Sequence, residues 1–387
     1  MKKIISADAT VRELGERLVV SDITRKMRQS EYLLDGFGHD AAFIDFPKES
    51  DEVLVVNTDR SGINAAYKFG LAGPECVGDL GVSHAVSDVV VAGGVPRAIT
   101  VALLLPADSS IGFVRGVMEG AQLAAERYGA FIVGGDTKQN ASFAMVVTVI
   151  GSAKKSQRIL RSGARPGDAL VVTGYLGSML LGMMVYGKNH VESIPIDDRT
   201  RAILEDALIM QRPPFRLGRA ISEAGVVRAG IDISDGLPGA IHAICGASGV
   251  GALVDESLIP LHPELKGLIS ASGLAPLQLS AAGGDWQYLY AIDPDGLAKL
   301  EKIATSQGDV IRVIGTVVEH GVTAVRTVQG AWCHLERLEH DSFADGVGGL
   351  SHFEKIQASI DPVHIAIDHR VCERIWSTRK WGGLPWQ

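Results

Sequence analysis

The feature that most constrains this chain is a set of five short segments centred on aspartate, most of which lie beside glycine or at the end of an aliphatic run. They are Gly36-Phe37-Gly38-His39-Asp40, Asn57-Thr58-Asp59, Val86-Ser87-Asp88, Gly134-Gly135-Asp136-Thr137 and Asp232-Ile233-Ser234-Asp235-Gly236. Carboxylates at strand ends and glycine turns do not serve a hydrophobic core. They suit a shared polar cavity, because Mg²⁺ prefers oxygen ligands and phosphate charge must be neutralised. The segments are therefore predicted to meet around a nucleotide.

The size and charge of the chain narrow the functional classes. A chain of 387 residues allows two domains with full cores and a small appendage. An apolar fraction of 46% with 21% charged residues indicates a globular protein. The net charge of −8 argues against a general nucleic-acid binder, since such proteins need basic surfaces. A small-molecule substrate is the expected partner.

The cysteines and the N-terminus indicate a compartment. Cys76, Cys245, Cys333 and Cys372 are widely separated and form no Cys-x-x-Cys pair, which favours reduced thiols. No secretory signal follows the first lysines, and no apolar run reaches the length of a membrane span. We expect a soluble, cytoplasmic protein that does not enter a membrane.

Strand-length aliphatic runs alternate with amphipathic helices along the chain. In the first half, strands are expected at 53–57, 99–105, 131–133 and 143–150, and helices at 78–91 and 111–128. In the second half, strands are expected at 169–173, 227–231, 252–254, 288–292 and 310–318, and helices at 198–224, 236–248 and 295–307. This pattern predicts two α/β or α+β domains.

The turn-rich segment 161–168 is the best candidate for a domain boundary. The predicted division is a helical lead-in over 1–30, a first domain over 31–156, a second domain over 157–339 and an extension over 340–387. The extension gains histidines and tryptophans. It either binds a partner or docks onto this chain or a sister subunit, and docking is the favoured interpretation.

Some of the aspartates also have a plain structural interpretation. An Asx-turn that closes a strand would account for Asp59. Asp88 lies in an otherwise apolar helix, so it faces either solvent or a cation, because burying an unpaired carboxylate is costly. Both interpretations of Asp88 stay open.

The remaining segments favour a function more clearly. Paired glycines before Asp136 exceed what a β-turn needs, and they let a backbone approach phosphate. A helix N-cap would explain one of Asp232 and Asp235 but not both. The familiar phosphate-loop and protein-kinase motifs are missing from the sequence, so a less common scaffold is expected.

Taken together, the motifs resemble the aminoimidazole-ribonucleotide-synthetase-like ATP-binding superfamily, and most of all its thiamine-monophosphate kinases. The resemblance spans about residues 30–320 and also includes Arg161-Ser162-Gly163-Ala164-Arg165-Pro166-Gly167-Asp168 and Gly283-Gly284-Asp285. It implies a two-domain synthetase-like architecture. The N-terminal mixed sheet would form a barrel in a homodimer, and the C-terminal domain would be α/β.

The resemblance also implies ATP and Mg²⁺ as cofactors, with a role for each motif. Its implied Mg²⁺ ligands are Asp40, Asp59, Asp88, Asp136 and Asp235. The implied catalytic residues are Asp88, Asp136 and Arg161. Residues implied to contact the nucleotide are Asn57, Thr58, Gly134, Gly135, Thr137, Asp232 and Ser234. Such enzymes work by positioning and charge neutralisation.

Two departures affect the expected activity. His39 replaces an acidic residue of the kinases, and Gly283-Gly284-Asp285-Trp286-Gln287 replaces a segment richer in acids. The leading hypothesis is an ATP- and Mg²⁺-dependent phosphotransferase or ATP-activating synthetase acting on a small, phosphorylated or heteroatom-rich substrate. The alternatives are a true thiamine-monophosphate kinase and an inactive nucleotide-binding sensor or assembly protein. The acceptor stays open.

Overall fold

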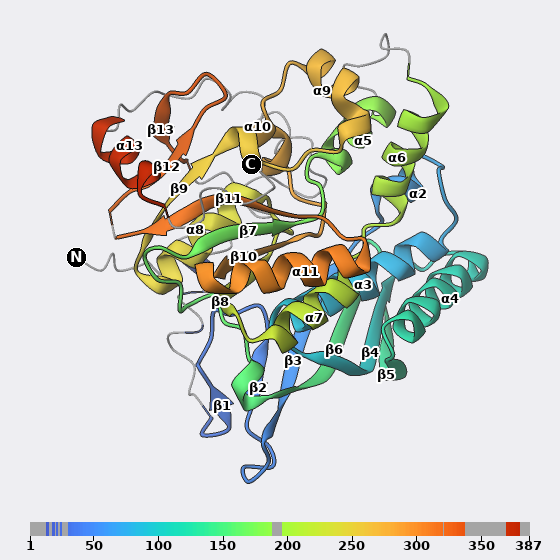
Figure 1. The fold of residues 1–387 in the computed structure, drawn as a ribbon. Helices are drawn as coiled ribbons and strands as arrows, with labels where there is room; N and C mark the ends of the chain where they lie inside the picture. Colours follow the sequence, from blue (N-terminus) through green and yellow to red (C-terminus); the bar gives the residue numbers. More distant parts are fainter. Residues whose placement is uncertain are drawn as a thin grey trace.

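The chain builds two sheets that lie side by side in space, each with its own helices (Figure 1). This computed structural model describes residues 30–187, 196–319, 321–336 and 369–379, with a few helical positions between 13 and 24. Most of the predicted lead-in and most of the C-terminal extension lie outside these residues. The mixed α/β character predicted for both halves is confirmed.

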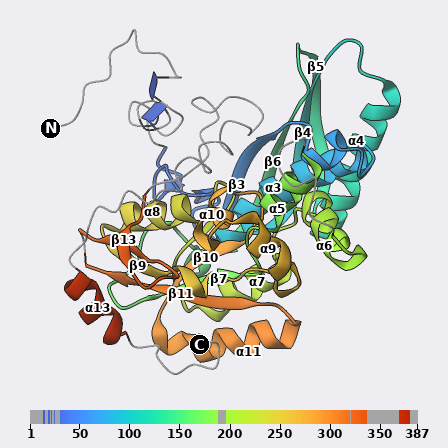
Figure 2. The ribbon, with the colours of Figure 1, turned by 90° about the horizontal axis from the view of Figure 1, so that it is seen from above.

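The first sheet is mixed, with only β4 and β5 running parallel. In order across the sheet its strands are β1 (Leu33–Leu34), β2 (Ala42–Ile44), β3 (Glu52–Ser61), β6 (Ala144–Lys154), β4 (Val95–Leu105) and β5 (Phe131–Gln139). Seen from above, β5 lies at the outer edge of this sheet (Figure 2). The short helix α2 (Ala65–Lys68) and the long helices α3 (Glu75–Val91) and α4 (Ile111–Arg127) belong to the same half.

Helix α3 is the central element of the molecule. It contacts α4, β3 and β6 on one side and α7 and β8 of the second half on the other. Nearly all of its side chains are buried, as expected of a helix that is apolar all round. Strand β3 alternates accordingly, with Val53 and Val55 buried, Leu54 and Val56 half-buried and Thr58 exposed on the opposite face.

The second sheet is antiparallel except where β9 pairs with β12. Across the sheet its strands are β13 (Trp332–His334), β12 (Thr323–Arg326), β9 (Gly251–Asp255), β11 (Ile311–Val318), β7 (Ala169–Thr173), β10 (Tyr288–Ile292) and β8 (Val227–Asp232). Helix α8 (Leu237–Ser248) packs on one face, in a core with Val172 and Ile231. On the other face, α7 (Phe215–Ala224) and α11 (Leu297–Gln307) share a core with α3.

One predicted helix is wrong. The single helix expected over 198–224 is two helices, α6 (Asp198–Ile209) and α7. Pro213 and Pro214 break it, because proline lacks a backbone N–H and disfavours helical geometry at the residue before it. The bend lets α6 lie against α5 (Ser178–Tyr186), while α7 packs on α3 and α11. The short helices α9 (Lys266–Ser272) and α10 (Pro276–Ala281) lie beside α5.

The described part of the C-terminal extension docks onto the second sheet, as favoured from the sequence. Helix α13 (His369–Ser377) places Trp376 against Trp332, with ring centroids 5.5 Å apart. The Trp332 indole also donates a 2.9 Å hydrogen bond to Glu373. The rest of the predicted extension, which includes Trp381 and Trp386, lies outside the described residues. Among the described helices, none has the length and apolar character to cross a membrane.

The contact between α3 and α4 depends on glycine, and this yields a prediction. A Cβ at Gly120 would lie 1.9 Å from the backbone oxygen of Glu75. We expect Gly120→Ala to lower the free energy of unfolding by about 1–3 kcal/mol, because the helices must move apart. Urea titration followed by circular dichroism measures it. The control is Gly112→Ala on the same helix, whose Cβ would meet nothing closer than 4.0 Å. Equal stability of the two variants would contradict the prediction.

Candidate functional site

Three aspartates from distant parts of the chain converge where the two halves meet. Asp40, Asp88 and Asp232 each offer a carboxylate oxygen, and these oxygens lie within 4.8 Å of one another. We call these residues the aspartate trio. Asp40 lies in the loop before β2, Asp88 on α3, and Asp232 at the end of β8. Because α3 contacts both β3 and β8, its burial is what brings the trio together.

Arg161 neutralises one member of the trio. Its Nε and Nη2 atoms lie 3.0 and 3.1 Å from the two carboxylate oxygens of Asp40. A bidentate contact of this kind between arginine and carboxylate is among the stronger charge-assisted hydrogen bonds. Asp40 in turn raises the pKa of the Arg161 guanidinium. The backbone N–H of Arg161 donates to Nδ1 of His39 at 3.3 Å, so His39 supports the arginine.

The other two carboxylates are held by neutral donors. Asn57 donates to Asp88 at 2.5 Å, while Ser87 and Ser234 donate to the two oxygens of Asp232 at 3.2 and 3.0 Å. Burial raises the pKa of Asp88 well above its ordinary value, and the nearby carboxylate of Asp232 adds to the shift. Burial, with the Asp40 charge, raises the pKa of Asp232 to about 8.

These shifts describe a site with surplus negative charge. One arginine cannot balance three clustered carboxylates, so at neutral pH protons stay on the trio unless a cation replaces them. An all-oxygen donor set of this kind fits Mg²⁺, which binds through carboxylates and keeps several waters. The trio is therefore chemically suited to hold a divalent cation.

Two further predicted residues lie beside the trio. Asp59 follows Asn57 on the same face of β3, and its charge contributes to the raised pKa of Asp88. Asp235 is exposed just beyond Asp232, and its charge raises the pKa of Asp232. Asp235 was predicted to hold the metal, and Asp232 was predicted to contact the nucleotide. In the structure it is Asp232 that joins the trio, and Asp235 lies beside it.

The glycine-rich segment lies elsewhere. Asp136 is exposed on β5 and accepts a hydrogen bond from the backbone of its neighbour Thr137 at 2.8 Å. Strands β6 and β4 lie between β5 and β3. Asp136 on β5 is therefore roughly 14 Å, or three strand spacings, from the strand that carries Asn57 and Asp59. Gly134 is exposed, and Gly135 fits closely against Val101, where a Cβ would lie 1.8 Å from the backbone oxygen. Within one chain, this segment does not join the trio.

Thr58 is also turned away from the trio. Its hydroxyl contacts that of Thr148 at 2.9 Å, on the face of the sheet opposite Asn57. A single β-strand cannot direct neighbouring side chains to one site, since successive residues point to opposite faces. The side chains of Asn57 and Thr58 therefore cannot both point toward a ligand held by the trio of the same chain.

Sequence reasoning missed the structural roles of two residues near the trio. Asp285 accepts backbone hydrogen bonds from Gly177 at 2.6 Å and Met179 at 3.0 Å, at the start of α5. Trp286 has a left-handed backbone (φ 51°) and stacks on His84 with ring centroids 3.3 Å apart. The partners lie too far away in sequence for any local pattern to pair them.

The pKa of Asp232 predicts how stability depends on pH. Between about pH 4 and 8 the folded chain keeps a proton that the unfolded chain has lost, so the free energy of unfolding falls as pH rises. Asp232→Asn cannot titrate. We expect its profile to be flatter, and its stability at pH 8 to exceed that of the wild type by about 1 kcal/mol or more. Urea unfolding in EDTA, with Asp198→Asn as a surface control, measures this, and parallel profiles would refute it.

Comparison with known proteins places this architecture in a family. The AIR synthase related protein N-terminal domain matches residues 38–153, and the C-terminal domain of the same family matches residues 165–328. The thiamine-monophosphate kinase of Pyrococcus horikoshii is 29% identical over 320 residues, covering 80% of this chain and 97% of the relative. That of Mycobacterium tuberculosis is 30% identical over 285 residues, covering 73% of this chain and 81% of the relative.

Solved structures agree with the sequence relatives. A structure of AaThiL complexed with AMPPCP and TMP superposes with a TM-score of 0.69 at 25% identity, covering 87% of this chain and all of that one. Hydrogenase maturation protein HypE in complex with ATP shares the fold alone, with a TM-score of 0.59 at 22% identity and coverage of 75% of this chain and 87% of HypE. With both of its domains matched, the chain belongs to the AIR synthase related family.

Proposed function

We propose that this chain is an ATP- and Mg²⁺-dependent enzyme that transfers a phosphoryl group to a small organic substrate. The observation that carries the proposal is the aspartate trio, which gathers Asp40, Asp88 and Asp232 beside Arg161. Surplus buried carboxylates with one guanidinium are suited to a metal–phosphate ligand. The thiamine-monophosphate kinases among its relatives, and AaThiL complexed with AMPPCP, support the choice of nucleotide.

The residues of the site have distinct tasks under this proposal. Asp40, Asp88 and Asp232 would hold Mg²⁺, with Asp59 and Asp235 on the rim as further carboxylates. Bound Mg²⁺ would neutralise phosphate charge during transfer. Arg161 can exchange its contact with Asp40 for one with a phosphate oxygen, because a guanidinium suits both. Asn57 and Ser234 keep the carboxylates in place, and no covalent step on the protein is needed.

The narrower proposal is that the acceptor is thiamine monophosphate, as the names of the relatives suggest. His39, which replaces an expected acid, accepts a backbone hydrogen bond from Arg161, so the change leaves the trio itself intact. Asp285, in the second altered segment, is committed to the backbone of α5. Neither departure removes a member of the trio.

The first test is turnover. Purified chain with ATP, Mg²⁺ and thiamine monophosphate is expected to release ADP and form thiamine diphosphate. Asp88→Asn should lower the rate about 100-fold or more, because it removes a central carboxylate of the trio while keeping its shape. Asp198→Asn, exposed on α6, is the matched control and should leave the rate unchanged.

Three other outcomes each have a distinct meaning. Turnover unchanged by Asp88→Asn would refute the proposed site. ADP release with other acceptors but not with thiamine monophosphate would refute the narrower proposal alone. ATP binding in calorimetry without turnover of any acceptor would favour a nucleotide-binding protein that is not an enzyme.

We also propose that two copies of the chain associate through the first sheet. The face of this sheet opposite α3 carries half-buried aliphatic side chains, among them Leu54, Val56 and Val146, and β5 leaves Phe131 and Val133 more than half exposed. Exposed apolar surface and an open strand edge favour a partner. A homodimer built on this face is the arrangement that the family resemblance implies, and a role for Asp136 in a site would require it.

Disruption of this face tests the association. Val146→Lys places a charge at the centre of the sheet's open face and should convert a dimer into a monomer that keeps its fold, since the side chain is only half-buried within one chain. Light scattering after size-exclusion chromatography measures the mass. Val328→Lys, half-exposed on the second half, is the control. A wild-type monomer, or a Val146→Lys dimer, would exclude this interface.

A further inference from the structure

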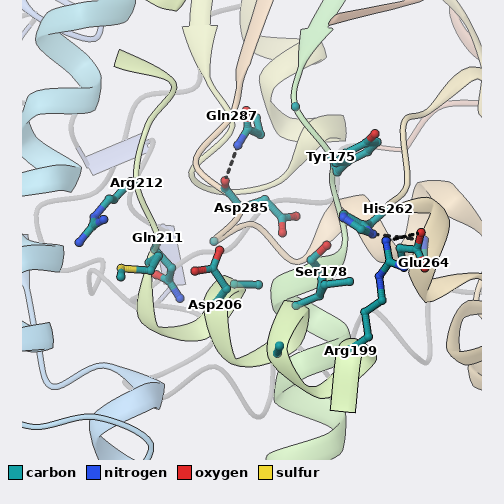
Figure 3. Close-up of a pocket in the computed structure, with 16 residues that line it drawn as sticks. Tyr175, Ser178, Arg199, Asp206, Gln211, Arg212, His262, Glu264, Asp285 and Gln287 are labelled. Carbon is teal, nitrogen blue, oxygen red and sulfur yellow. Dashed lines mark hydrogen bonds and ion pairs between the residues drawn. The ribbon is translucent and has the colours of Figure 1, made fainter. Parts of the chain in front are cut away.

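A cavity in the second half has no role in the site described so far. It has a volume of about 690 Å³ and opens between α5, α6 and the loop over 284–287 (Figure 3). Tyr175, Ser178, Asp206, Gln211 and His262 are among the residues whose side chains line it. A cavity of this size accommodates a single-ring organic molecule with substituents.

The positive groups around the cavity are already paired. Arg199 lies 3.0 Å from Glu264, and Arg212 lies 2.9 Å from Asp79, a carboxylate outside the cavity that also pairs with Arg127. Desolvation lowers the pKa of His262, so its imidazole is neutral near pH 7 and adds no positive charge. A ligand with a negative charge would therefore find no uncommitted cation among the described residues that line the cavity.

The acidic side chains that line the cavity are not all paired with a donor or a positive charge. Asp285 is held by the backbone N–H groups at the start of α5. The carboxylate of Asp206 points into the cavity and has no ion pair or hydrogen bond with any residue that the structure describes (Figure 3). One uncommitted carboxylate thus faces the space in which a ligand would lie.

The rest of the lining suits a flat, positively charged molecule. Tyr175 and His262 meet edge to face with ring centroids 4.8 Å apart and form an aromatic wall. Aromatic faces attract cations and stack on rings. The Ser178 hydroxyl and the Gln211 amide provide neutral hydrogen-bonding groups nearby.

We infer that this cavity binds a small organic cation, such as an amine on a single ring, with Asp206 as its counter-ion and Tyr175 as its aromatic contact. The assignment of the ligand as the phosphoryl acceptor rests on the proposed function. The binding of the cation itself does not.

Contacts between neighbouring residues link the lining of the cavity to the aspartate trio. Gly284, which lines the cavity, donates its backbone N–H to the carbonyl of Ser234 at 3.1 Å, and Ser234 in turn holds Asp232. The side chain of Gln211 lies close enough to His84 to oppose the lowering of its pKa, and His84 lies one helical turn before Asp88. These contacts connect the lining of the cavity to Asp232 and to the helix that carries Asp88.

Binding of matched probes, without nucleotide or Mg²⁺, tests the cation site. We would use 2-phenylethylamine, the neutral 2-phenylethanol and the anionic phenylacetate, with affinity measured by ligand-observed NMR. The amine should bind the wild type about fivefold more tightly than the alcohol, with phenylacetate weakest. Asp206→Asn and Tyr175→Ala should each remove most of this preference, whereas Asp198→Asn should not. Melting temperatures within the error of the wild type establish that the variants are folded.

Each contrary result has its own consequence. Equal affinity for amine and alcohol, tighter binding of phenylacetate, or a preference unchanged in Asp206→Asn would overturn the cation site. If the amine binds as expected but Asp206→Asn leaves the KM for thiamine monophosphate unchanged, the cavity is not the acceptor site. If ATP turnover is never found, the proposed function fails while the probe measurements still decide the cavity.

Discussion

The burial of α3 between two sheets is the constraint on which the rest of the molecule depends. This helix is apolar on almost every side, so it is stable only when both halves of the chain cover it. Its tight contact with α4 requires glycines at the crossing. Asp88 and His84 lie on the same helix, one turn apart, and they receive their surroundings from the second half. The core and the site are therefore products of the same packing.

Much of the fold was predictable because its local signals are strong. Aliphatic runs of strand length, closed by glycine, proline or aspartate, located β3, β4, β6, β7, β8 and β10, and amphipathic spacing located α4 and α8. The failure at α6 and α7 arose because apolar periodicity continued across Pro213 and Pro214, although these prolines end a helix. The prediction of one helix over 198–224 thus gave too little weight to the two prolines.

The site was predictable only in part, for a reason that lies in geometry. Sequence patterns identified Asp40, Asp88 and Arg161, but which aspartates meet depends on register and on strand faces. Thr58 neighbours Asn57 in sequence yet points to the other side of the sheet. Asp136 is carried by an edge strand. Asp206 and Tyr175 had no recognisable motif, because a cavity wall is assembled from elements whose spacing appears only after folding.

The position of the trio has a mechanical consequence. Asp88 is fixed to the helix that covers the first sheet, while Asp232 ends a strand of the second sheet. The distance between their carboxylate oxygens therefore depends on the relative orientation of the two halves. A rotation that parts α3 from β8 would open the trio and weaken the cation binding proposed for it. By reciprocity, a bound cation would resist that rotation. The contact of α3 with α7, remote from the carboxylates, thereby becomes a place where a substitution can tune ion affinity without touching a ligand.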